Sequence, residues 1–307
     1  MAAKILMVGS VMMDLILQMK KMPVASESVL GKTYSNAGGG KGSNSAIAAA
    51  RLGGDVAVYG TVGKDSNGEA LRQMIQNENV NTQYLSTDDS EKTGMAVILL
   101  EDGGNNRIII FKGANETTSP DAIKEAVETI KPDAVMLQLE IPIVTNKTAL
   151  KAAQEKGIIT CLDAGPAQEY PLEEMQGLTI LSPNETETKA LTGIFPDDDE
   201  TCLEASKRLM ERAHCQFVIL KLGKQGSYIY GEGKAVRVPA YKIEAVDPTA
   251  AGDAFTGALV KHYVESGDIV KAAEYANAVG AITCTALGAQ PSLPNQDAVE
   301  AFLQAIK

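Results

Sequence analysis

In the second half of the chain, short apolar runs alternate with longer segments whose apolar residues recur at helical spacing. Strands that alternate with helices of this length are typical of a doubly wound, mainly parallel β-sheet with helices on both faces. We therefore expect an α/β fold. The expected helix–strand pairs are 120–130 with Ala134–Leu139, 144–156 with Ile158–Leu162, and 200–213 with Phe217–Leu220.

Three segments, at about 15–19, 29–35 and 95–111, have the apolar content of strands but fall outside this rhythm. The last of them contains two apolar runs around the glycine- and asparagine-rich turn at 102–106. We expect these strands to form a small β-sheet, inserted as a lid in a single domain that spans 1–307. The sequence shows no internal repeat, low-complexity segment or linker.

Composition narrows the function class. The chain has 307 residues, of which 45% are hydrophobic, so it can bury a full core. Its formal net charge of −11 argues against nucleic acid as a partner, because phosphate backbones are bound by basic surfaces. A nucleotide is not excluded, since a few local groups hold it.

The four cysteines, Cys161, Cys202, Cys215 and Cys284, are scattered and form no CxxC pair. This spacing is typical of reduced cysteines in a cytoplasmic protein. The apolar run that begins at Lys4 is too brief for a signal peptide or a membrane span, so we expect no membrane partner. Only two histidines are present, which leaves little material for a zinc site.

The stretch with the most chemistry is Asp247-Pro-Thr-Ala-Ala-Gly-Asp253-Ala-Phe, where a turn of small residues opens an apolar helix. Ala251, Gly252 and Asp253 lie in the first turn, where backbone N–H groups lack helical partners. These donors and the helix dipole favour an anion. Asp253 can then take a proton from a substrate hydroxyl beside that anion, as phosphoryl transfer requires. An acidic cap on a buried helix explains the stretch equally well.

A second glycine-rich stretch, Ala37-Gly-Gly-Gly-Lys41-Gly-Ser-Asn44, leads into a helix. Its glycines permit close approach to a ligand, and Lys41 and Asn44 supply donors for hydroxyl groups. It is not a Walker A loop, because Gly42 follows Lys41 where Ser or Thr is needed. The alternative is a simple glycine turn. Asp14 and Glu140 each follow a strand, where ligands gather in open α/β sheets.

Asn184 and Glu187 lie three residues apart at the start of a helix and share one face. An amide oxygen and a carboxylate there suit a hydrated Mg²⁺, which takes few protein ligands. Taken alone, the pair is better explained as a variant of the capping box. The turn at Gly223 and Gly226 follows a strand and either passes close to phosphates or simply turns the chain.

Three motifs together resemble the ribokinase/phosphofructokinase-B family of sugar kinases. They are Gly39-Gly-Lys-Gly-Ser-Asn44, Pro183-Asn-Glu-Thr-Glu187 and Asp247-Pro-Thr-Ala-Ala-Gly-Asp253-Ala-Phe-Thr-Gly257, in the family's order and at roughly its spacing. The resemblance covers essentially the whole chain. It implies the doubly wound fold with a β-sheet lid and transfer of the ATP γ-phosphoryl group to a primary hydroxyl of a sugar.

The resemblance also implies roles for individual residues. Asp253 matches the family's catalytic base, and the amides of Ala251, Gly252 and Asp253 match its anion hole. Positions that match the sugar contacts are Asp14, Gly40, Lys41, Asn44 and Glu140. Positions that match the nucleotide site are Asn184 and Glu187 for magnesium and phosphate, Gly223 and Gly226 for the nucleotide loop, and Asn277 beside the adenine.

Members of the family bind a monovalent cation, K⁺ by expectation, next to the anion hole. The matching positions are Asp247, Thr249, Thr283, Gly288 and Ser292. Asp247 would then be a structural charge that the ion neutralises. The resemblance further implies a homodimer formed by packing of the lid sheets.

One position departs from the family pattern. Met12 stands two residues before Asp14, where these kinases usually carry Asn. An Asn side chain hydrogen-bonds sugar hydroxyls and Met cannot, so Met12 favours a sugar with hydrogen at that place. The same substitution resembles the pattern in 2-deoxyribose kinases. We expect a kinase for ribose or 2-deoxy-D-ribose. The alternatives are a kinase of the same family for another sugar, a sugar acid or a nucleoside, or a regulator without catalytic activity.

Overall fold

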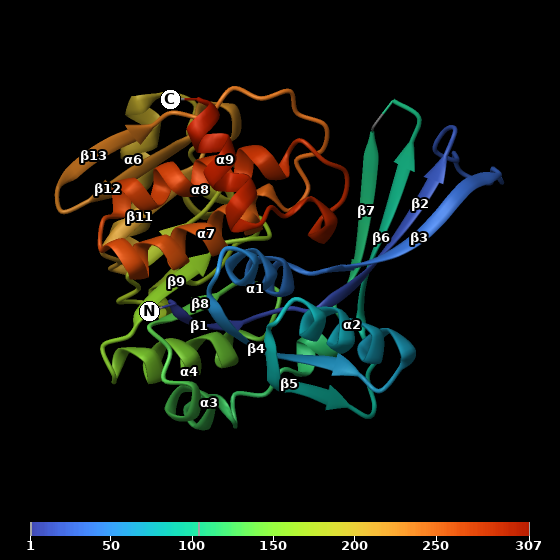
Figure 1. The fold of residues 1–307 in the computed structure, drawn as a ribbon, viewed down its shortest axis with the longest axis horizontal. Helices are drawn as coiled ribbons and strands as arrows, with labels where there is room; N and C mark the ends of the chain where they lie inside the picture. The colour runs from blue at the N-terminus through green and yellow to red at the C-terminus, as the bar shows by residue number, and fades with distance from the viewer. Residues whose placement is uncertain (1, 104, 307) are drawn as a thin grey trace.

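A nine-stranded sheet forms the centre of the molecule in the computed structural model, which describes residues 2–103 and 105–306. Its strand order is β13-β12-β11-β10-β9-β8-β1-β4-β5, and all strands run in one direction except β12, which is antiparallel to both of its neighbours (Figure 1). The predicted doubly wound, mainly parallel sheet is therefore confirmed. The strands are β1 Lys4–Val8, β4 Asp55–Gly63, β5 Asn81–Asp88, β8 Ala134–Leu137, β9 Ile159–Asp163, β10 Ile180–Ser182, β11 Phe217–Lys221, β12 Ser227–Gly231 and β13 Lys234–Val238.

Helices cover both faces of this sheet, because successive side chains of each buried strand point to opposite sides. Ile5 and Met7 of β1 belong to one apolar cluster, and Leu6 and Val8 belong to the other. The helices are α1 Lys41–Arg51, α2 Ser66–Asn77, α3 Ile123–Ile130, α4 Ile143–Gln154, α5 Glu185–Thr192, α6 Asp199–Ala213, α7 Ala251–Ser266, α8 Ile269–Thr283 and α9 Gln296–Ala305.

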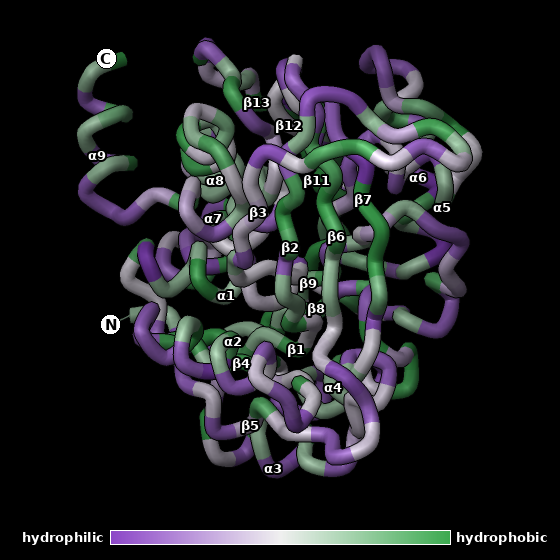
Figure 2. Tube along the Cα trace, turned by 90° about the vertical axis from the view of Figure 1, so that its right-hand side faces the viewer, coloured by the Kyte–Doolittle hydropathy of each residue, from purple (hydrophilic) through white to green (hydrophobic). Residues whose placement is uncertain are grey.

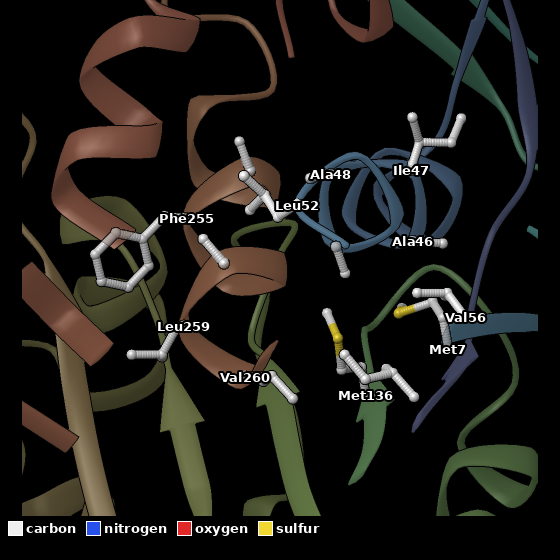
Figure 3. Packing of buried hydrophobic residues seen from close by; sticks show 14 of the residues in the cluster. Met7, Ala46, Ile47, Ala48, Leu52, Val56, Met136, Phe255, Leu259 and Val260 are labelled. Carbon is white, nitrogen blue, oxygen red and sulfur yellow. The ribbon is translucent and has the colours of Figure 1, made fainter. Parts of the chain in front are cut away.

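The helices α1 and α7 pack closely on one face of the sheet and fix the geometry of the candidate site. Figure 3 shows Leu52, which follows α1, together with Phe255 and Val260 of α7 in a cluster that also contains Met136 of β8. A Cβ on Gly257 would lie only 2.5 Å from the carbonyl oxygen of Ser45, so the two helix backbones approach each other without room for a side chain. This contact aligns the N-terminal ends of the two helices.

A separate four-stranded sheet, which we call the lid sheet, projects from the body (Figure 1). Its order is β3-β2-β6-β7, and its hydrophobic colour runs along much of β2, β6 and β7 in Figure 2. The strands are β2 Met12–Met19, β3 Gly31–Gly39, β6 Gly94–Glu101 and β7 Asn106–Phe111. These strands extend beyond several of the expected ranges. Residue 104, in the expected turn at 102–106, lies outside the described residues.

Two elements differ from the sequence prediction. The strand β3 continues to Gly39, because Gly38 and Gly39 pair with Met13 and Met12 of β2, so part of the expected glycine loop is strand. The edge strand β5, Asn81–Asp88, was not predicted, because its alternating polar residues lack a continuous apolar run. Within 2–103 and 105–306, no helix is both long and apolar enough to cross a membrane.

Candidate active site

The first turn of α7 provides an anion site, although a narrower one than predicted. Ala250 adopts a left-handed conformation with φ of 60°, which turns the chain into the helix at Ala251. The N–H of Ala251 donates to the carbonyl oxygen of Pro248 at 3.1 Å, so the expectation that it is free is wrong. Among the residues that the structure describes, none accepts from the N–H groups of Gly252 and Asp253. These two amides and the helix dipole remain for an anion.

The carboxylate of Asp253 lies between this turn and the start of α1. Its Oδ2 accepts a hydrogen bond from Asn44 Nδ2 at 2.8 Å, and its Oδ1 lies 3.4 Å from Lys41 Nζ. Burial favours the neutral amine of Lys41, but the carboxylate of Asp253 and others nearby outweigh this, so the pKa of Lys41 lies above its ordinary value. The Oδ1 of Asn44 is buried without a protein partner in the described chain, which leaves it able to accept from a ligand hydroxyl.

Asp14 and Glu140 converge on the same end of the site. Glu140 follows β8 and accepts from Ser10 Oγ and from the backbone N–H of Lys41, the latter at 3.2 Å. Burial, and then the carboxylates of Glu140 and Asp253, raise the pKa of Asp14 to about 7. Burial also raises the pKa of Glu140, against the opposing charge of Lys41. A cluster of carboxylates with one lysine is suited to hydrogen-bonding several hydroxyl groups of a polyol.

The glycines before α1 allow the backbone to pass close to these groups. A Cβ on Gly39 would collide with the carboxylate of Asp14, and Gly40 has φ of 92°, a conformation that favours glycine. Met12 begins β2 and is buried, with its Cγ 3.3 Å from the point that a Cβ on Gly94 would occupy. Met12 and Asp14 lie two residues apart on β2, so their side chains lie on the same face of the lid sheet.

Asn184 and Glu187 form the capping box that their spacing predicts. Asn184 Oδ1 accepts from the N–H of Glu187 at 2.9 Å, and Glu187 Oε2 accepts from the N–H of Asn184 at 2.7 Å. The other carboxylate oxygen of Glu187 lies 3.9 Å from Lys41 Nζ, so this buried side chain also faces the candidate site. Capping and a role at the site are therefore compatible.

The residues predicted to contact the nucleotide, Gly223, Gly226 and Asn277, differ in their surroundings. A Cβ on Gly223 would meet only the tip of Glu185 at 3.4 Å, so its surroundings are open. A Cβ on Gly226 would clash with the backbone of the neighbouring strand β13, so this glycine is explained by the hairpin itself. Asn277 of α8 donates through Nδ2 to the carbonyl oxygens of Val238 and Pro239, each at 3.2 Å, and thereby ties α8 to the end of β13.

The predicted cation residues are only partly brought together. Asp247 accepts from Thr249 Oγ1 at 2.6 Å and from the N–H of Gly288 at 2.9 Å, so the loop at Gly288 folds back onto Asp247. The hydroxyl of Thr283 donates inside its own helix, and that of Ser292 donates to Ala289. Burial raises the pKa of Asp247, but the hydrogen bonds from Thr249 and Gly288 have the larger effect and bring the pKa below its ordinary value. The side chain is therefore ionised.

Three buried residues next to the site were not predicted. Asp163 closes β9, Lys221 closes β11, and Thr256 lies one turn along α7 from Gly252. The available signal was a charged residue at the end of an apolar strand, the same signal that singled out Glu140. Across the described ranges, no three His, Cys, Asp or Glu side chains gather as a metal cluster.

Comparison with known proteins identifies the family. The pfkB family carbohydrate kinase model matches residues 2–296. The ribokinase of Haemophilus influenzae is 32% identical over 297 residues, which cover 96% of this chain and 97% of that protein. The deoxyribokinase of Salmonella typhi is 32% identical over 301 residues, which cover 97% of this chain and 98% of that protein.

A solved structure of Arabidopsis thaliana ribokinase, complexed with ribose and ATP, has a TM-score of 0.91 and 31% identity to this chain and covers 99% of both chains. The similarity thus extends over the lid sheet, the central sheet and all three motifs. The chain belongs to the pfkB family of carbohydrate kinases, enzymes that transfer a phosphoryl group to a sugar.

Proposed function

We propose that this protein transfers the γ-phosphoryl group of ATP to the 5-hydroxyl of a pentose, either D-ribose or 2-deoxy-D-ribose. The observation that carries the proposal is the buried carboxylate of Asp253 in the first turn of α7, where the N–H groups of Gly252 and Asp253 have no acceptor among the described residues. A base within reach of an anion site is the arrangement that phosphoryl transfer to an alcohol needs. The ribose and ATP bound by the Arabidopsis relative support the same substrates here.

In the proposed reaction, Asp253 accepts the proton of the sugar hydroxyl while the amides of Gly252 and Asp253 bind the transferring phosphoryl group. Asn44 and Lys41 hold the carboxylate through their contacts with its two oxygens. Asp14 and Glu140 accept hydrogen bonds from other hydroxyls of the sugar and fix the reacting oxygen in place. The open surroundings of Gly223 support a role for its turn in holding the nucleotide.

Two ions fit the residues present. Glu187, with one carboxylate oxygen outside its capping bond, and Asn184 would hold a hydrated Mg²⁺, which shields the charge of the nucleotide phosphates. Asp247 is ionised, yet no lysine or arginine pairs with it in the described part of the chain. An unpaired carboxylate of this kind suits a monovalent cation, with Thr249 and Gly288 beside it.

The choice between the two pentoses rests on Met12. Overall similarity does not decide it, because a ribokinase and a deoxyribokinase are both 32% identical to this chain. A thioether cannot hydrogen-bond a sugar hydroxyl as an amide does. A pocket that lacks this partner discriminates weakly in favour of ribose and accepts the deoxy sugar.

The experiment is an ATP-coupled assay of ADP release with ribose, 2-deoxyribose, fructose, nucleosides and 2-keto-3-deoxygluconate, with Mg²⁺ and with or without K⁺. We expect turnover with the two pentoses and a ratio of their kcat/KM values that shifts toward ribose by about 10-fold or more in Met12→Asn. An unchanged ratio would refute the role of Met12. Absence of turnover with either pentose would refute the proposed substrate class.

We also propose that two copies pack through their lid sheets. Paired residues of neighbouring strands share a face of the sheet, so Asp14 and Ile110 lie on one face, each opposite Ala96 of β6. Ile109 and Phe111 lie on the other face and are 50% and 57% exposed. The lid sheet thus offers one face to the sugar and a second apolar face to another copy.

The scattered cysteines support a location in the cytoplasm, where thiols stay reduced.

A further inference from the structure

A buried ion pair lies beside the first turns of α7, apart from the residues assigned above. Lys221 Nζ lies 2.7 Å from Asp163 Oδ2, and Thr256 Oγ1 donates to the same oxygen at 2.6 Å. The exposed fractions of Lys221, Asp163 and Thr256 are 8%, 3% and 1%. The strands β9 and β11 supply the two charges, and α7 supplies the hydroxyl. Their geometry is therefore fixed by the central sheet and by the helix that carries Asp253.

The ammonium group of Lys221 faces the candidate anion site. Two of its donors are used by Asp163 and by Thr256 Oγ1, the latter at 3.5 Å. An ammonium has three N–H donors, and the described residues provide no acceptor for the third. Lys221 Nζ lies 3.8 Å from the point that a Cβ on Gly252 would occupy, and among the described residues no other heavy atom outside the adjacent residues and backbone of α7 comes within 4 Å of that point. The space beside Gly252 is thus open, with a cation at its edge.

The lysine keeps its charge despite its burial. Burial favours the neutral amine, but the carboxylates of Asp163 and Glu187 outweigh that effect, and the pKa of Lys221 lies above its ordinary value. A buried ion pair is a poor source of stability, because the cost of desolvating both groups offsets their attraction. Folding alone therefore gives little reason for a lysine at the end of β11, whereas an anion in the space beside Gly252 does.

We propose that Lys221 is a further catalytic residue, whose ammonium binds an oxygen of the γ-phosphoryl group in the space beside Gly252. Asp163 and Thr256 hold the ammonium in that direction. The proposal rests on the proposed function, since it assumes that the anion is the γ-phosphoryl group of ATP.

The role is electrostatic and involves no proton transfer from the lysine. The sugar oxygen forms a bond to the γ-phosphorus and loses its proton to Asp253, while the bond from that phosphorus to the β-phosphate oxygen breaks. ADP leaves with the electron pair of the broken bond. Lys221 keeps its three protons and offsets negative charge on the transferring group, together with the amides of Gly252 and Asp253.

The competing explanation is that Lys221 only neutralises Asp163. Lys221→Met alone cannot separate the two, because it leaves a buried carboxylate unpaired and can unfold the protein. The double variant Asp163→Asn with Lys221→Met removes both charges and keeps an acceptor for Thr256. Replacing a buried ion pair by neutral groups of similar volume is usually tolerated. This variant therefore tests, in a folded protein, whether the charge of Lys221 beside Gly252 is needed.

The experiment compares wild type, both Lys221 variants and a matched control, Lys261→Met. Lys261 is also buried, with 7% of its surface exposed, and it forms an ion pair with Glu265 at 2.9 Å. It lies toward the C-terminal end of α7, away from the candidate anion site. Three quantities are measured for each protein: the midpoint of thermal unfolding, the dissociation constants of Mg²⁺-AMP-PNP and Mg²⁺-ADP by calorimetry, and kcat with the best pentose. Only AMP-PNP carries a group in the γ-position, and its binding requires no sugar.

We expect the double variant to unfold near the wild-type midpoint, with kcat lower by about 100-fold or more. Its affinity for AMP-PNP should fall by about 10-fold or more, and that for ADP by much less. The control should keep its kcat. Recovery of kcat and AMP-PNP affinity in the double variant would overturn the proposal, since neutralising Asp163 would then explain Lys221. If no pentose is phosphorylated but AMP-PNP binding still depends on Lys221, the sugar assignment fails and the γ-phosphoryl contact stands.

Discussion

At the scale of single residues, the proposed reaction depends on the carboxylate of Asp253. Asp253→Asn keeps the shape of the side chain but removes the base, so kcat should fall by at least about 100-fold. Sugar affinity should change little, because Asp14 and Glu140 are proposed to hold the other hydroxyls. Measurements of ADP release and of sugar binding by calorimetry check this. The control is Asp268→Asn, at the cap of α8. Near-normal turnover by Asp253→Asn would show that another group takes the proton.

Asp14 gives the site a dependence on pH. Its pKa is raised to about 7 by burial and by the carboxylates of Glu140 and Asp253. In the proposed site the ionised form of Asp14 would accept hydrogen bonds from sugar hydroxyls, so sugar affinity should increase as pH rises through about 7. Calorimetry from about pH 5.5 to about pH 8.5 measures this. Asp14→Asn should bind weakly with no such break. A break that persists in this variant would belong to another group, such as Glu140, whose pKa is also raised.

The same raised pKa has the opposite consequence for stability. A carboxyl with an ordinary pKa when unfolded and a pKa of about 7 when folded binds more protons in the native state between those values. The contribution of Asp14 to stability is therefore favourable at low pH and is lost as pH rises toward 7. As pH rises through about 7, ionisation of Asp14 should therefore increase sugar affinity and decrease the stability of the free protein.

The site residues that could be predicted from sequence are those that belong to a distinctive motif. Asp253 and Lys41 were predicted from two motifs more than 200 residues apart, and the structure brings them to 3.4 Å. Asp163 and Lys221 were not predicted, because each alone is only a charged residue at a strand end. Their pairing depends on which strands are neighbours of β10, which no local pattern reveals. The engagement of the Ala251 N–H depends in the same way on the turn at Pro248.

At the scale of elements, two glycines of α7 should behave differently. Gly252→Ala places a methyl group in open space beside Lys221, and Ala favours the helix over Gly by up to about 1 kcal/mol. The thermal midpoint should stay or rise, while kcat falls by about 100-fold because the methyl group displaces the phosphoryl group. Gly257→Ala is the comparison, since its Cβ would press on the backbone of Ser45. That variant should lose about 1–3 kcal/mol of stability.

The two glycine variants distinguish a glycine that leaves room for a ligand from a glycine that lets two helices pack closely. Thermal unfolding and turnover are measured on both proteins under the same conditions. Equal activity of Gly252→Ala and wild type would mean that the phosphoryl group lies elsewhere. A Gly257→Ala protein of unchanged stability would mean that α1 and α7 are not held at their close approach.

The elements themselves were predicted where apolar period and length agree, as in the alternating helices and strands from residue 120 onward. The edge strand β5 was missed, because a strand with one solvent face and many polar residues resembles a loop. The prediction for the glycine-rich stretch was only partly correct. Gly38 and Gly39 are strand because their partners on β2 determine pairing, and the sequence of β3 alone carries no sign of it.

At the scale of the whole molecule, the proposed dimer would link catalysis to assembly through the lid sheet. One of its faces carries Asp14, and the other carries Leu17, Ile109 and Phe111. A single four-stranded sheet exposed on both sides is an unfavourable arrangement for an isolated domain, since it leaves a continuous apolar face in water. Packing against a second copy would cover that face and hold the sheet in position over the sugar.

This arrangement predicts a dimer that a charge on the outer face disrupts. Wild type should sediment as a dimer at micromolar concentration, and Ile109→Lys should sediment as a monomer, because a buried lysine without a partner opposes association. Val236→Lys is the control, since Val236 is an exposed apolar residue, 37% accessible, on β13 of the central sheet. Sugar affinity measured on the same samples tests the coupling. The monomeric variant should bind sugar more weakly, because its lid sheet has lost its support. A monomeric wild type, or a dimer that survives Ile109→Lys, would place any assembly interface on another surface.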